Sequence, residues 1–219
     1  MSAPERGKTW LDDPRAVDIL TTEHWSLLST RALGYQEMFG RATTFVAVLS
    51  GIIVALALLA QVTRFGRVTL AFALLLIAVA LFIGVVTFVR CVGINYEDAR
   101  WVRGMSLLRR AYLEMVPELE QFLVTGHEPD PDRGALRHGS PQHLRNLASS
   151  LTTTSGVVAA LNSVLAGVLA CDLGLLAGTG RAASTLIGVG VSLLSAILHI
   201  RYAAGFRRSH SPTHPEDVT

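Results

Sequence analysis

Residues 68–89 read VTLAFALLLIAVALFIGVVTFV, an apolar run without a single charged side chain. The hydrocarbon core of a bilayer is about 30 Å thick, so a helix needs roughly 20 mostly apolar residues to cross it. Three further segments meet this requirement, at residues 43–62, 154–176 and 182–202. None of the four alternates apolar with polar residues, which favours helices over barrel strands. The sequence therefore predicts an all-α, polytopic membrane protein with four transmembrane helices. The alternative is a set of buried core helices, which rarely run this far without a polar face.

The charged residues are unevenly placed along the 219-residue chain. The chain holds 19 Lys and Arg residues and 17 Asp and Glu residues. Only four of these charged residues lie in the segments 42–89 and 146–200, namely Arg64, Arg67, Asp172 and Arg181. Such segregation argues against a soluble globular enzyme. The sequence also lacks a phosphate-binding loop, a GxSxG elbow and an HExxH motif. We therefore expect no enzymatic activity and no cofactor.

The basic residues predict the orientation in the membrane. Three of them lie in the two short loops between paired spans, and the others lie before the first span, between the second and third spans, or in the tail. The positive-inside rule then places both termini and the middle segment in the cytoplasm. Residues 1–41 lack the apolar core of a cleavable signal, so we expect the first span to direct insertion. One Lys beside 18 Arg is typical of a GC-rich bacterial genome, which predicts a bacterial plasma membrane.

Heptad-like seams continue both of the first two spans into the predicted cytoplasm. The first seam precedes span one and comprises Val17, Leu20, His24, Leu27, Arg31, Gly34 and Met38. The second follows span two, with a charged opposite face, and comprises Trp101, Met105, Leu108, Tyr112, Met115, Leu119 and Phe122. Spacing of this kind predicts long helices that pack through these seams. Asp12 or Asp13 is expected to cap the first helix, and Pro117 to kink or restart the second.

The extensions are expected to pack on each other as an antiparallel hairpin, because residues 63–67 join the two spans by a short loop. An oligomeric coiled coil and an amphipathic helix on the membrane surface are the alternatives. The predicted organisation is a disordered N-terminus at 1–13, a long-helix hairpin at 14–124 and a cytoplasmic linker at 125–150. A second helical hairpin follows at 151–204, and a disordered tail at 205–219.

Small residues recur at helical spacing in three of the spans. Such faces let membrane helices approach closely. They serve either the packing of one four-helix bundle or contacts between subunits and the lining of a pore. The candidate faces are Ala47, Gly51 and Ala55 in span one, Ser163 and Gly167 (with Ala159 and Cys171) in span three, and Ser184, Gly188 and Ser192 (with Ala196) in span four.

Three polar residues inside the spans are candidate sites. Asp172 is the only acidic residue in a span, and an intramembrane carboxylate is a functional candidate by default. It lies near the outer end of span three, where it can instead pair with Arg64, Arg67 or Arg181. Asn162 is expected to make an interhelical hydrogen bond, and His199 to bond to backbone near the inner end of span four.

Metal and disulfide sites are not expected. His127, Glu128, Asp130, Asp132, His138 and His143 share the flexible linker, but their spacing matches no established metal site. Cys91 and Cys171 lie at opposite ends of their spans, so the bilayer keeps them apart.

Ala47–Gly51 and the residues up to Gln61, preceded by Arg41, resemble the first span of the Orai calcium-channel subunits. The resemblance implies four spans with both termini inside. Leu59 stands where that family carries the glutamate of its calcium filter, so calcium selectivity is not implied.

Two functions are consistent with these patterns. In the first, the chain is a homo-oligomeric, channel-like component of the membrane. In the second, it is a membrane-anchored scaffold whose cytoplasmic coiled-coil hairpin binds a partner protein through Trp101, Met105, Leu108, Tyr112 and Met115. The expected partners are the lipid bilayer, further copies of the chain and, for the scaffold, a cytoplasmic protein, with no nucleic acid. We expect function to involve the junction around Arg41, Arg90 and Cys91.

Overall fold

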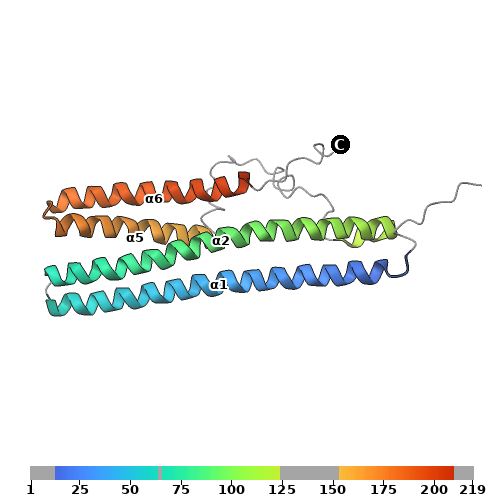
Figure 1. Cartoon of the computed structure of the whole chain (residues 1–219), viewed down its shortest axis with the longest axis horizontal. Helices are drawn as coiled ribbons and strands as arrows, with labels where there is room; N and C mark the ends of the chain where they lie inside the picture. The colour runs from blue at the N-terminus through green and yellow to red at the C-terminus, as the bar shows by residue number, and fades with distance from the viewer. Residues whose placement is uncertain (1–12, 64–65, 124–152, 210–219) are drawn as a thin grey trace, which may run out of the picture. The chain divides into compact units, whose positions relative to one another are not determined.

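The computed structural model describes residues 13–63, 66–123 and 153–209, and these residues form helices and turns without any strand (Figure 1). The elements are α1 (Ala16–Thr63), α2 (Arg67–Met115), the 3-10 helix η2 (Pro117–Phe122), α5 (Thr154–Leu176) and α6 (Arg181–Ser209). Each of the four α-helices is long and apolar enough to cross a membrane. The all-α prediction is thus confirmed for the described residues.

The ends of the helices follow local rules of the sequence. Thr153 caps α5 by accepting a hydrogen bond from the Gly156 backbone N–H at 3.2 Å. The α2 helix ends at Met115 because the residue before a proline disfavours helical geometry, and η2 starts at Pro117 as expected. Gly178 has a φ of 83° in the turn after α5, a conformation that glycine adopts without steric cost.

The observed bounds match the expected spans to different degrees. The α5 helix coincides with residues 154–176, and the segments at 43–62 and 68–89 lie inside α1 and α2, which contain 48 and 49 residues. The α6 helix continues past the expected end at Tyr202 as far as Ser209, so residues 205–209 of the expected tail are helical. Arg207 and Arg208 in this stretch are strong helix formers. The predictions for residues 1–12, 125–150 and 210–219 concern residues outside the described ones.

The chain divides into two compact units, each of which is described by itself. The first unit contains residues up to Gln36 and residues from Asn95 to Ser140. In it, α1 and α2 pack as an antiparallel pair. The Tyr112 hydroxyl donates to the Leu20 carbonyl oxygen at 3.0 Å, while Arg31 bonds to Asp98 near the other end of the unit.

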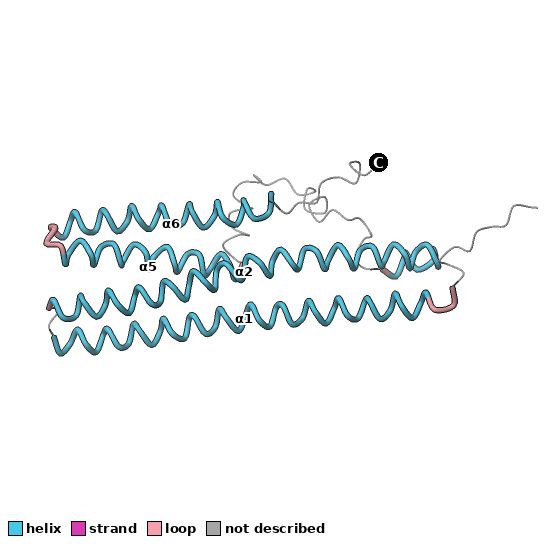
Figure 2. The backbone as a smooth tube through the Cα atoms, viewed as in Figure 1, coloured by secondary structure: helices cyan, strands magenta, loops and turns pink. Residues whose placement is uncertain are grey.

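The second unit contains residues 37–94 of α1 and α2 together with α5 and α6. Its core is a cluster of apolar side chains contributed by α1, α2 and α5, with Phe45 and Ala80 fully buried. The α5 and α6 helices lie side by side (Figure 2). This unit carries the predicted small-residue faces and polar candidates.

Candidate functional site

The small-residue faces of α5 and α6 pack against each other. A Cβ atom placed on Gly167 would lie 2.7 Å from the Gly188 carbonyl oxygen, and one placed on Gly188 would lie 2.7 Å from that of Gly167. The Ser192 Cβ approaches the same position on Gly167 at 2.9 Å. The two backbones therefore touch at these glycines, as small residues permit. Ser163 and Ser184 are buried on the same two helices.

The small-residue face of α1 is not used in this way. Ala47, Gly51 and Ala55 are all exposed. A Cβ placed on Gly51 would meet nothing within 4 Å. Of the three predicted faces, the one on α1 is thus left uncovered by the described part of the chain.

Asn162 is fully buried on the face of α5 that meets α1 and α2. Its Oδ1 lies directly over Gly84, so that a Cβ atom on this glycine would overlap it, and the same Cβ would lie 2.8 Å from the Phe45 ring. Neither Oδ1 nor Nδ2 has a hydrogen-bond partner among the described residues. The amide is close enough to Gly84 for a weak Cα–H···O contact. Sequence reasoning missed Gly84, for which the only signal was a single glycine within a run of larger residues.

Asp172 is 6% exposed on α5, and its Oδ2 has no hydrogen-bond partner among the described residues. The ion pairs found in the described part of the chain do not include it, so neither Arg67 nor Arg181 pairs with it there. Arg64 lies outside the described residues. Burial of an unpaired carboxylate is costly, and it is relieved by a proton or by a cation.

His199 is held by its own helix and by α2. Its Nδ1 lies 2.7 Å from the Ser195 carbonyl oxygen, which can only accept, so Nδ1 carries a proton. The ring stands edge-on to Phe88 with 4.6 Å between centroids. These contacts account for His199 as a packed residue of the second unit.

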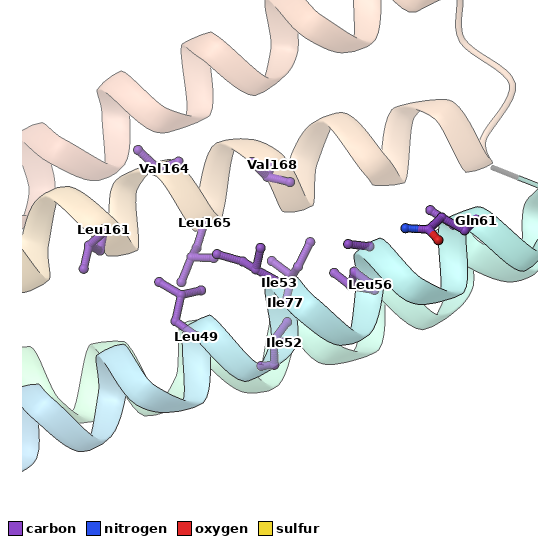
Figure 3. A pocket seen from close by; sticks show the side chains of 12 residues that line it. Leu49, Ile52, Ile53, Leu56, Gln61, Ile77, Leu161, Val164, Leu165 and Val168 are labelled. Atoms are coloured by element: carbon purple, nitrogen blue, oxygen red, sulfur yellow. The ribbon is translucent and has the colours of Figure 1, made fainter. Parts of the chain in front are cut away.

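An apolar groove opens between α1 and α5, with Ile77 of α2 at its floor (Figure 3). Its volume is about 680 Å³. Gln61 is the only residue with a polar side chain among those that line it. A groove of this composition can hold an apolar chain or a helix side, but it offers no group for orienting a polar ligand.

The junction highlighted by the sequence contains a charged cluster. Glu37 accepts two hydrogen bonds from Arg90, both at 2.8 Å, and one from Arg41 at 2.9 Å. These guanidinium groups lower the pKa of Glu37 to about 2, with Arg90 as the larger cause. Cys91, the neighbour of Arg90, is completely buried. The sequence pointed to Arg41, Arg90 and Cys91 but missed Glu37, which connects the two arginines.

The expected seam on α2 packs inside the first unit. Met105 is 4% exposed, Tyr112 lies 6.0 Å from the His24 ring, and Trp101, Leu108 and Met115 are half-buried. On α1, Leu27 lies against Gly104, whereas Val17 is 56% exposed at the start of its seam.

The first unit also contains an ion pair between Arg31 and Asp98 that is supported by a further hydrogen bond from Tyr35. Arg31 Nε donates to Asp98 at 2.6 Å, and the Tyr35 hydroxyl donates to the same carboxylate at 3.1 Å. The Asp98 hydrogen bond raises the pKa of Arg31.

No three His, Cys, Asp or Glu side chains come together as a metal site within the described residues, and the histidines and acids of the linker lie outside them. Both cysteines are free thiols. No family model, no curated protein and no solved structure matches the chain.

Proposed function

We propose that the chain is a multi-pass protein of a bacterial plasma membrane that works as a homo-oligomer. Its role is that of a channel-like component, with both termini and the extensions of α1 and α2 in the cytoplasm. The observation that carries the proposal is the uncovered small-residue face of α1, formed by Ala47, Gly51 and Ala55. Such faces drive membrane helices together through close backbone contact.

A path for a polar solute is proposed to lie between copies and not through one copy. The core of the second unit is mainly apolar, with Phe45, Ile77 and Phe88 among its buried side chains, and the Asn162 amide is buried beside them. Channels line their paths with carbonyl groups, polar side chains or charged rings. The α1 face, which combines small residues with Ser50 and Thr44, is better suited to this role than that core.

The mass of the purified protein in nanodiscs tests the proposal. We expect a closed oligomer for the native chain and a smaller species for Gly51→Leu, which fills the uncovered face. Leu58→Ile is the matched control, because Leu58 is an exposed residue of the same helix and the change conserves volume. A monomeric native chain would refute the proposal.

Planar-bilayer recording tests the channel itself. The native oligomer is expected to conduct under voltage, pH or osmotic change, and Gly51→Leu is expected to lose this conductance. An oligomer that stays silent under all three would leave self-association standing and remove the channel.

The scaffold function remains the second candidate, with a different docking surface from the one expected. Met105 is buried and Trp101 and Tyr112 are half-buried in the first unit, so they offer less surface to a partner than a fully exposed residue does. The exposed Trp25 on α1 favours this candidate instead. Retention of a cytoplasmic protein by a monomeric chain, lost in Trp25→Ser, would support it.

A further inference from the structure

Besides the seam that faces α2, α1 carries another heptad-spaced row of residues on the side away from α2. Between Thr22 and Gln36 its members follow a strict spacing of three and four residues, and each is exposed and uncharged: Thr22, Trp25, Ser29, Ala32 and Gln36. We call these five residues the outer seam. The preceding position of the same spacing is the charged Asp18. Heptad spacing of this kind marks a helix face that packs against another helix.

The outer seam is uncharged, and large apolar side chains are exposed on it and beside it. Trp25 is 63% exposed, and the flanking Leu28 and Leu33 are 41% and 65% exposed. The outer face of α2 in the same unit differs, because its exposed residues include Arg100 and Arg103. Surfaces buried at protein interfaces are depleted of charge and enriched in aromatic residues, with tryptophan a frequent centre of binding energy. The outer seam has this character and the α2 face does not.

We infer that the outer seam binds the outer seam of a second copy of the chain, as a parallel coiled-coil contact. This inference rests on the proposed function, since two copies inserted alike in one membrane are related by an axis along the membrane normal. Around such an axis each α1 lies parallel to its counterpart, and every seam residue meets its own copy.

Symmetry explains the absence of charge. A charged side chain on the axis would face its identical copy, and like charges held close across an interface are destabilising. A foreign partner of opposite charge would impose no such restriction. The five outer-seam positions from Thr22 to Gln36 are uncharged, and the charged Arg31 lies on the inner side, where it pairs with Asp98. A second copy is therefore the occupant that this pattern fits.

The spacing continues along α1 beyond the first unit. Phe39, Thr43, Val46 and Ser50 follow at steps of three or four residues, and each is exposed in the second unit. The repeat thus reaches the same part of the helix that carries the uncovered small-residue face.

Disulfide trapping in native membranes tests the contact, using the full chain with Cys91→Ala and Cys171→Ser as background. Ser29→Cys places a thiol on the outer seam, and Ala99→Cys places one at an exposed small residue of α2 as the matched control. Thiols link only when their Cα atoms lie within about 7 Å. We expect a covalent dimer with Ser29→Cys and none with Ala99→Cys. Equal yields, or no dimer at Ser29, would overturn the inference.

Charge insertion provides the second test. Trp25→Glu puts like charges on the axis, whereas Leu107→Glu changes a residue of similar exposure on α2. We expect Trp25→Glu alone to reduce the oligomeric mass in nanodiscs, with the helical circular dichroism of both variants unchanged. An unchanged mass overturns the inference and leaves the proposed function standing, whereas a monomeric native chain overturns both. Lipids that carry a quencher would reduce the tryptophan fluorescence of the native chain if the membrane surface covered Trp25. If this quenching is present in the native chain and lost in Trp25→Phe, the membrane surface covers the outer seam and the inference is overturned.

Discussion

Substitution of Gly188 by alanine tests the backbone contact between α5 and α6. The added methyl group would lie 2.7 Å from the Gly167 carbonyl oxygen and 3.0 Å from the Cys171 Cβ. Favourable contacts between heavy atoms lie near 3.5–4.0 Å, so the helices have to move apart by about 0.8–1.3 Å. The obstacle is backbone, which cannot rotate away as a side-chain end can. Overpacking of this kind costs about 1–3 kcal/mol.

Gly190→Ala is the matched control on the same helix. Nothing lies within 4 Å of the Cβ that this change adds. Both variants gain the same helix propensity, about 0.5–1 kcal/mol in soluble helices, so the difference between them isolates the overpacking cost. For a chain of about 200 residues, each kcal/mol corresponds to roughly 2–4 °C in the unfolding midpoint. We therefore expect Gly188→Ala to unfold below Gly190→Ala by about 2–12 °C.

Thermal unfolding in detergent, followed by circular dichroism, measures this difference. A fluorogenic thiol reagent gives an independent readout, because Cys171 lies against Gly188. Separation of α5 and α6 is expected to make the reagent label the Cys171 thiol faster in Gly188→Ala and not in Gly190→Ala. Equal midpoints and equal labelling rates for the two variants would refute the close approach of α5 and α6.

Three further outcomes are expected. Gly84→Ala should lower the unfolding midpoint, because its methyl group would overlap the buried Asn162 amide and lie 2.8 Å from the buried Phe45 ring. An unchanged midpoint would contradict these contacts. The pKa of Glu37 is lowered from 4.5 to about 2, so the stabilisation that its carboxylate gives the fold is complete above pH 4.5 and is lost as the pH falls toward 2. When the thermal unfolding midpoint is measured over a pH series, we expect acid to lower it less in Glu37→Gln than in the native chain. Arg31→Met should cost about 1–3 kcal/mol by leaving the Asp98 carboxylate without its guanidinium, seen as faster hydrogen exchange in residues 16–36, and exchange at the native rate would argue against a stabilising pair.

The extent of the helices followed from the sequence because local rules decide it. An uncharged run of sufficient length predicts a helix, Pro117 ends α2, and Thr153 supplies the cap of α5. The apolar run marks the end of the fourth span near Tyr202 but not the end of α6, because Arg207 and Arg208 lower the hydropathy and still favour a helix. The antiparallel pairing of α1 and α2 in the first unit involves only part of the seams read from the sequence, because Val17 and Phe122 at their ends are 56% and 70% exposed.

The partners of the candidate residues were decided by tertiary structure alone. Small residues at helical spacing look alike in sequence, yet Gly167 meets Gly188 while Gly51 meets nothing within 4 Å. Spacing within one helix fixes which residues share a face, but it cannot say which face another helix will cover.

The charged and polar contacts show the same division. Sequence placed Arg90 at the end of a span, but its pairing with Glu37 joins residues 53 positions apart. The space that Gly84 leaves by having no side chain is filled by Asn162, which again comes from a distant segment of the chain. Sequence by itself thus determined the helices and their uncharged stretches, because these depend on local propensity and transfer of side chains from water. Only the tertiary structure decided which faces are covered, because close packing depends on the shapes of segments that meet in space.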